Sequence, residues 1–439
     1  MKRRTAILIG IVAGLVLFGA LVQIFRICRS EKLRGQAETL VEAGDYTSAR
    51  LIYEMLGDED GASHCKAMQT EEVYQEGVRL FHSDDYVGAG KQFSSLEAYK
   101  DTVGLTAACR WQEALELDNR EMLLAALRGF QSLDACSSCQ NAREQISSRL
   151  FDQAQALAAD FRLEDACQIW QELGSYQNSA LLYRRGLQAL AWANVPEDEK
   201  ILVPENRYFS ETLDNVYLCD LAYIVLPEEW NGDPHFFVYY PGGRDEEMSV
   251  DYLLYYMMNP SPDTMAIFLR QNGLNNMREK TGQAIDLLDR VAAECGLFAQ
   301  EIVVAGSSLG AYPAMHSVVY SDEDYGIRTD CVLSLDAGSD WMEDWLLLSE
   351  EDCRKTARIG TAFYLFESPW VGMNREGICR MVNTGNNVTM VGCTFDEHVR
   401  ISLDAMGMGV VDWAVGDRSQ PCNPDIYEFV QLRPDNGQS

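Results

Sequence analysis

The chain has 439 residues, 47 % of them hydrophobic and 23 % charged, which is the composition of a folded protein rather than a disordered one. This length is enough for two or three domains. The formal net charge of -31 excludes a protein that wraps nucleic acid, because phosphate binding requires a basic surface. Thirteen cysteines in a chain of this length do not make a disulfide-dense secreted scaffold, and most stand in apolar runs, as buried free thiols do.

Residues 1–4 form a short N-terminal tail, and residues 5–25 contain no charged side chain. At ~1.5 Å rise per residue these twenty-one residues would span ~31 Å, which matches the ~30 Å hydrocarbon core of a bilayer. No small-residue pair marks a signal-peptide cleavage site, so the stretch predicts an uncleaved single-pass transmembrane helix. Basic residues before it favour the bacterial N-in/C-out arrangement, with the bulk of the chain extracytoplasmic. Basic residues after it and the cysteine content leave the cytoplasmic side open.

Residues 35–190 contain a pattern that recurs four times. Each unit has a small residue, a second small residue twelve positions later and a bulky aromatic four positions after that, as in Ala37, Ala49 and Tyr53. The units begin at Ala37, Gly77, Ala114 and Ala154, which are 40, 37 and 40 residues apart. Small residues at these offsets let two helices approach closely, so the pattern predicts a solenoid of helical hairpins.

This spacing resembles the tetratricopeptide repeat (TPR), although the period is longer and the closing proline is missing. The resemblance implies an all-α, TPR-like domain that positions or binds a protein partner. Nothing in the repeat itself indicates which partner that is.

After a polar connector at 191–204, the pattern changes to short strands alternating with helices over residues 205–420, followed by a C-terminal tail at 421–439. Near-continuous apolar runs predict strands buried on both faces, as in a parallel sheet. The alternation with helical segments predicts a doubly wound, mostly parallel α/β sheet. The predicted strands lie at 219–227, 235–243, 263–270, 301–306, 330–338, 361–368 and 387–395.

The motif Gly306-Ser307-Ser308-Leu309-Gly310 is a GxSxG that stands between a predicted strand and a predicted helix. Flanking glycines allow a sharp turn that exposes the Ser308 hydroxyl, and the following helix N-terminus favours developing negative charge. Without this context the motif could be only a glycine-lined bend. With it, Ser308 is predicted to be a nucleophile.

A nucleophilic serine needs a base, and His398 is the histidine that lies downstream of Ser308 and just after the last predicted strand. This order resembles the α/β-hydrolase superfamily, in which serine, acid and histidine follow one another along the chain. The resemblance implies that the acid is Glu367, at the end of the strand before the histidine strand. Asp336, at the end of the strand after the nucleophile, remains the alternative.

The resemblance also implies an oxyanion hole made by the backbone N–H of Leu309 and by Gly242 and Gly243, in the loop after the apolar run HFFVYY at 235–240. The chain is then a membrane-anchored serine hydrolase of the esterase type, acting on an ester- or acyl-bearing substrate without a cofactor or metal. Two alternatives stay open: an O-acyltransferase that uses the same triad, and a non-catalytic membrane-bound adaptor in which the repeats carry the function.

Overall fold

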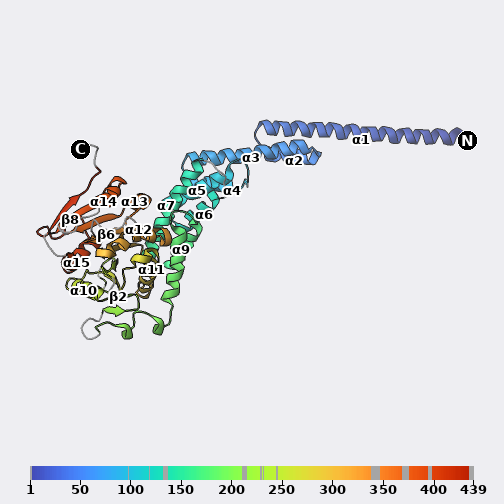
Figure 1. Cartoon of the computed structure of the whole chain (residues 1–439). Helices are drawn as coiled ribbons and strands as arrows, with labels where there is room; N and C mark the ends of the chain where they lie inside the picture. The colour runs from blue at the N-terminus through green and yellow to red at the C-terminus, as the bar shows by residue number, and fades with distance from the viewer. Residues whose placement is uncertain are drawn as a thin grey trace. The chain divides into compact units, whose positions relative to one another are not determined.

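The computed structural model describes the backbone of residues 2–96, 98–117, 119–131, 137–209, 215–227, 230, 232–243, 246–337, 347–367, 375–393 and 398–434. Side chains are described within these ranges except at 2–13, 16, 116–117, 131, 137–139, 246–248, 367, 375, 393, 398–400 and 402. The chain divides into two compact units, Met1–Leu150 and Phe151–Ser439. The order of the elements can be followed by colour in Figure 1.

The first unit is helical. Its elements are α1 (Lys2–Glu42), α2 (Tyr46–Leu56), α3 (Glu59–His82), α4 (Tyr86–Ser94), α5 (Thr102–Leu117), α6 (Arg120–Gln131) and the start of α7 (Ser137–Ala159). Aspartates begin two of the helices at equivalent places in the repeat: Asp45 accepts from the Ser48 N–H and Asp85 from the Gly88 N–H. A carboxylate at this position satisfies an amide that has no partner within the helix, so the turn sequences define where the hairpins fold back.

Small and aromatic repeat positions are buried between the helices. Ala37, Ala49 and Ala89 are fully buried, and Tyr53 is 9 % exposed. A β-carbon on Gly77 would lie 2.6 Å from the ring of Phe93, so this helix pair packs closely only because glycine is present. The predicted limits of the four units and of the domains remain predictions.

The prediction of a single-pass transmembrane helix over residues 5–25 is wrong, and with it the predicted membrane localisation. These residues belong to α1, which runs without a break from Lys2 to Glu42. Among the residues that the structure describes, no helix is long and apolar enough to cross a bilayer.

The second unit continues from α7 and combines further helices with a sheet. Its helices are α8 (Leu163–Leu173), α9 (Ser179–Ala193), α10 (Glu246–Tyr256), α11 (Met277–Glu294), α12 (Ala311–Tyr325), α13 (Glu350–Ile359), α14 (Arg375–Asn383), α15 (His398–Gly407) and α16 (Val410–Val415), with short 3-10 turns η1 (Glu197–Glu199), η2 (Pro204–Asn206), η3 (Leu274–Asn276) and η4 (Ser308–Gly310). Its strands are β1 (Val216–Leu218), β2 (Ala222–Val225), β3 (His235–Tyr240), β4 (Thr264–Leu269), β5 (Glu301–Ser307), β6 (Arg328–Leu335), β7 (Ala362–Glu367), β8 (Asn387–Cys393) and β9 (Tyr427–Gln431).

In the described part of the chain these strands form one nine-stranded sheet in the order β1-β2-β4-β3-β5-β6-β7-β8-β9. The strands from β4 to β8 in this order are parallel neighbours, whereas β1, β2 and β9 pair antiparallel at the edges. The fold class predicted from the sequence is therefore corrected on two points: the transmembrane helix is wrong, and the sheet is mixed. The carboxyl ends of β3, β5, β6, β7 and β8 all lie at one edge, because these strands run parallel.

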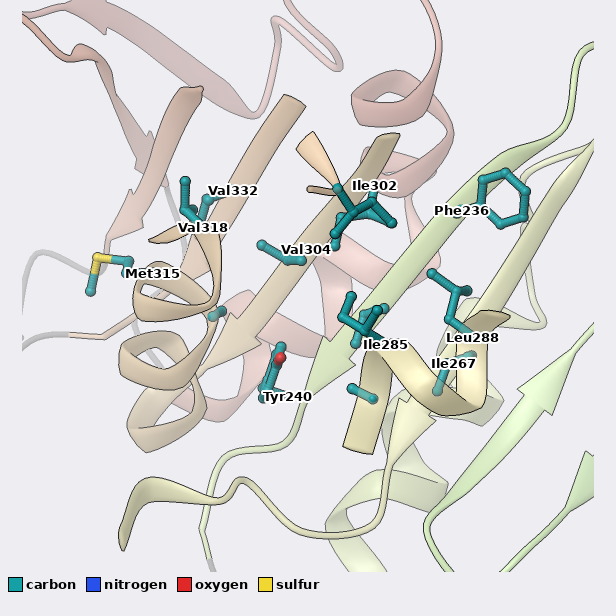
Figure 2. Packing of buried hydrophobic residues seen from close by; sticks show 14 of the residues in the cluster. Phe236, Tyr240, Ile267, Ile285, Leu288, Ile302, Val304, Met315, Val318 and Val332 are labelled. Carbon is teal, nitrogen blue, oxygen red and sulfur yellow. The ribbon is translucent and has the colours of Figure 1, made fainter. Parts of the chain in front are cut away.

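Helices cover both faces of the sheet, and the strands alternate between two cores. On one face Phe236, Val238 and Tyr240 of β3 pack with residues of α11 and α12. On the other face Phe237 and Tyr239 pack with residues of α10, α15 and α16. Figure 2 shows the first face, where α11 and α12 place their side chains against the sheet. Burial on both faces explains why the strands appear in the sequence as continuous apolar runs.

Helix α9 is joined to the sheet-bearing part of the second unit by a buried ion pair. The guanidinium of Arg185 donates to both carboxylate oxygens of Asp289, at 2.8 and 2.6 Å, and to the carbonyl oxygen of Ala299 at 2.6 Å. Arg185 is 4 % exposed and Asp289 is 3 % exposed. The last helical hairpin therefore packs as part of the same unit as the sheet.

Candidate active site

Ser308 lies at the turn between β5 and the helix that follows it. Strand β5 ends at Ser307, Ser308 begins the 3-10 turn η4, and α12 continues from Ala311. The backbone of Ser308 has a φ of 47°, in the left-handed region that costs a non-glycine residue about 1–3 kcal/mol. Its side chain is half-buried. A strained strand-to-helix turn of this kind directs a hydroxyl outwards at the edge of a sheet.

The two glycines that flank Ser308 are required because other backbone atoms lie too close to them for a side chain. A β-carbon on Gly306 would lie 2.5 Å from the carbonyl carbon of Gly310. A β-carbon on Gly310 would lie 2.8 Å from the carbonyl carbon of Pro241 and would clash with the carbonyl oxygens of Tyr240 and Pro241. Glycine is therefore needed at both positions because the backbone packs closely there. Neither glycine has a positive φ.

The loop after β3 contacts the serine turn. Gly242 is buried, and a β-carbon there would lie 3.0 Å from Ser307 Oγ and 3.4 Å from Ser308 Cβ. Gly243 follows with a φ of 43°, and Leu309 is half-buried directly after the serine. The three residues predicted for the oxyanion hole thus come from two elements that meet at Ser308. Backbone N–H groups from two such elements can stabilise an oxyanion if they converge on it.

Asn272 holds this loop in place, although the sequence did not predict it. Its Nδ2 donates to the carbonyl oxygen of Gly243, and its Oδ1 accepts from the Leu274 N–H at 3.0 Å. The side chain is 8 % exposed, so these hydrogen bonds are largely shielded from water. The Asn272-Gly273 pair directly after an apolar strand is a turn signal that could have pointed to this residue.

The two candidate acids both stand at the carboxyl ends of parallel strands near β5. Asp336 directly follows β6, has a φ of 55° and is 1 % exposed, and its N–H donates to the Phe366 carbonyl oxygen at 2.8 Å. Glu367 is the last residue of β7, where its backbone pairs in register with Gly392 of β8. The side chain of Glu367 lies outside the described residues. Strand topology therefore puts both backbones at the edge that carries Ser308.

His398 begins α15, five residues after β8 ends at Cys393. It therefore follows the carboxyl end of a parallel strand, as Ser308 and both candidate acids do. The His398 side chain lies outside the described residues. Two other histidines stand elsewhere in this unit: His316 is buried in α12 with its ring 6.1 Å from that of Tyr320, and His235 begins β3 at the opposite edge.

Comparisons with known proteins add little to this geometry. No protein-family profile matches the chain, so the likeness of the repeats to the tetratricopeptide repeat is not supported, and no curated protein matches it either. Among solved structures the chain is similar to naproxen esterase (carboxylesterase NP) from Bacillus subtilis, at 10 % identity over 54 % of this chain and 98 % of that one, with a TM-score of 0.32. It is also similar to carboxylesterase CesB from Bacillus subtilis, at 11 % identity over 52 % and 95 %, with a TM-score of 0.30. Scores this low carry no argument, so the proposals below rest on the geometry of this chain.

Proposed function

We propose that the protein is a serine hydrolase of the esterase type, with Ser308 as its nucleophile. The observation that carries this proposal is the strained backbone of Ser308, with a φ of 47°, between two glycines that leave no room for a side chain. Folding retains such strain only where the surrounding structure holds it, and it clusters at functional sites. Other non-glycine residues of the chain, such as Lys100 and Asp263, also have a positive φ. The combination of this angle with two close-packed glycines at a strand-to-helix turn is what favours a nucleophile.

The proposed mechanism begins with attack of Ser308 Oγ on an ester or acyl carbonyl. His398 takes the serine proton as general base and then gives it to the leaving group, so that an acyl-enzyme forms. Glu367, or Asp336 as the alternative, holds the imidazole and stabilises its charged form. Water then attacks the acyl-enzyme with His398 again as the base, and the acid product leaves.

Backbone amides are proposed to stabilise the tetrahedral oxyanion. The N–H of Leu309 stands directly after the nucleophile, and Gly242 and Gly243 contribute from the loop that contacts the serine turn. The Asn272 side chain supports this arrangement, because it donates a hydrogen bond to the carbonyl oxygen of Gly243 and so restrains the loop. A donor that is held in place before the reaction needs no reorganisation during it.

The order of the elements supports the same assignment. Ser308 and Asp336 directly follow β5 and β6, Glu367 is the last residue of β7, and His398 comes after β8. The carboxyl ends of these parallel strands lie at one edge of the sheet. The chain order serine, acid, histidine is the one that α/β-hydrolases use.

The test is labelling of the full-length protein with a fluorophosphonate, which reacts only with an activated serine. Wild type should be labelled, Ser308→Ala should not, and His398→Ala should react slowly because the base is lost. Ser307→Ala, which removes the neighbouring buried hydroxyl, and His235→Asn, at the opposite edge of the sheet, are the matched controls and should still be labelled. Folded wild-type protein that stays unlabelled would show that Ser308 is not an activated nucleophile.

A further inference from the structure

A polar groove lies next to the proposed oxyanion hole. It extends from Leu309 to the turn after β4 and the first turns of α11, and its volume is about 480 Å³. Its wall includes the side chains of Gln271, Asn275 and Gln283, all exposed to solvent. The groove therefore begins one residue after the serine that is proposed to attack the substrate.

The chemistry of the wall favours a ligand with many hydroxyl groups. Within the described part of the chain, the side-chain amides of Gln271 and Asn275 make no hydrogen bond to another residue, and each offers two donors and one acceptor. Gln283 donates to the carboxylate of Glu279 at 3.3 Å and keeps its carbonyl oxygen as an acceptor. An alkyl chain placed here would cover these groups without pairing them, which is unfavourable.

The charges of the groove favour a neutral ligand. Glu279 and Lys280 both line it, and their opposite charges cancel within the wall. An anionic ligand such as a phosphate would gain from the lysine and lose to the carboxylate. The turn that carries the amides packs closely against α11. Gly273, with a φ of 71°, lies so near the Lys280 side chain that a β-carbon would not fit between them.

A different recess offers a place for the acyl part of a substrate. It lies between α12 and α14 and has an apolar wall that includes Met315, Leu365 and Met381. Tyr312, four residues after Ser308 in the chain, is one of its lining residues. The two recesses thus differ in polarity, and hydrocarbon is better accommodated in this one.

We propose that the groove between Leu309 and α11 binds the polyhydroxylated alcohol of the substrate, so that the ester cleaved is an acyl group on a sugar hydroxyl. This inference rests on the proposed function of Ser308. In the reaction the bond between Ser308 Oγ and the acyl carbon forms as the bond to the sugar oxygen breaks, and the serine proton passes through His398 to that oxygen. Water then releases the acid.

The test compares two acetate esters that differ only in their alcohol, an O-acetylated methyl glucoside and methyl acetate, with the full-length protein. Wild type should have the higher kcat/KM for the sugar ester. In Gln271→Ala/Asn275→Ala the ratio of the two kcat/KM values should fall about tenfold, because hydrogen bonds to the sugar are lost. Gln171→Ala, an exposed glutamine in α8, is the matched control and should leave the ratio unchanged.

A second measurement separates failure of this inference from failure of the proposed function. Cleavage of both esters with a ratio that the double variant does not change would overturn the groove assignment and leave the serine hydrolase standing. If neither ester is cleaved, titration of Ser308→Ala with methyl glucoside decides the matter. Binding that the double variant weakens would support the groove, and absence of binding would overturn it.

Discussion

The hydroxyl of Tyr239 lies 2.6 Å from the Oγ of Ser307, the residue that precedes Ser308. Tyr239 is fully buried and Ser307 has no exposed surface, so this hydrogen bond is made away from water. Burial raises the pKa of Tyr239 well above its usual value, and the phenol therefore stays neutral. The residue before the candidate nucleophile is thus fixed to β3, the strand whose following loop carries Gly242 and Gly243.

Replacing Tyr239 by phenylalanine should destabilise the protein, because the Ser307 hydroxyl would stay buried without its partner. The expected loss in the free energy of unfolding is about 1–3 kcal/mol. Urea denaturation of the full-length protein measures it, through the unfolding transition of the second unit. Tyr240→Phe, on the other face of the sheet, is the matched control. The Tyr240 hydroxyl lies 3.4 Å from that of Thr281, which keeps its 2.9 Å hydrogen bond to the Met277 carbonyl oxygen when the phenol is removed. Equal losses in the two variants would show that the hydrogen bond between Tyr239 and Ser307 contributes no more to stability than that of Tyr240.

Gly310→Ala should be poorly tolerated, because its β-carbon would clash with the carbonyl oxygens of Tyr240 and Pro241. We expect a loss of about 3 kcal/mol or more in unfolding free energy, and loss of fluorophosphonate labelling as the turn shifts. Gly35→Ala is the same substitution within α1, where nothing lies within 4 Å of the added carbon. There the change should stabilise the helix by about 0.5–1 kcal/mol. A mild effect at Gly310 would show that the close packing is not needed.

The central strands could be predicted from the sequence, and the edges of the sheet could not. Apolar runs at 235–243, 263–270 and 301–306 correspond to β3, β4 and β5, because strands buried on both faces need continuous hydrophobic side chains. β1 and β9 were not predicted. In β9, Tyr427–Gln431, only the first residue is buried, and a short, largely exposed strand carries no apolar run to detect.

Two further features depend on contacts between distant parts of the chain, which a local sequence pattern cannot predict. The GxSxG motif could be recognised, but the reason for Gly310 is the approach of Tyr240 and Pro241 from β3, seventy residues away in the chain. The contact of Asn272 with the loop after β3 could not be predicted, because its hydrogen bond to Gly243 exists only in the folded sheet.

Removing one partner of the buried pair between α9 and α11 should be costly. Arg185→Met would leave the Asp289 carboxylate buried without its counter-charge, and we expect a loss of about 3–5 kcal/mol in unfolding free energy. Arg185→Met/Asp289→Leu should recover most of this, because no charge is then left unpaired. Urea denaturation of the single and double variants measures both. A double variant as unstable as the single one would mean that the ion pair itself holds α9 in place.

Glu71 should remain ionised to unusually low pH. The Lys100 ammonium donates to both of its carboxylate oxygens, at 2.6 and 2.8 Å, and with the Tyr99 hydroxyl lowers the pKa of Glu71 from 4.5 to about 2. A lowered pKa means that the stabilising contribution is complete above the unfolded value and is lost as the pH falls through about 2.

An NMR titration of ¹³C-labelled glutamate checks this, and Lys100→Gln should move the Glu71 midpoint back towards 4.5. Arg79→Gln is the control, because Arg79 pairs with Glu76 at the next turn and should leave the Glu71 midpoint unchanged. A wild-type midpoint near the usual glutamate value would contradict the hydrogen-bonded arrangement.

The choice between the two candidate acids can be made by neutralising each in turn. Glu367 ends β7, one strand before the strand that precedes His398, whereas the buried Asp336 directly follows β6, the strand next to the serine strand. Since the acid orients the imidazole and stabilises its charged form, we expect Glu367→Gln to lower the rate of fluorophosphonate labelling by about 10³–10⁴-fold, and Asp336→Asn to lower it by less than about tenfold. Both variants must unfold at the urea concentration of the wild type, because Asp336 sits in a strained turn with a φ of 55°. The opposite ranking, at equal stability, would make Asp336 the acid, so that the nucleophile and the acid would follow the adjacent strands β5 and β6.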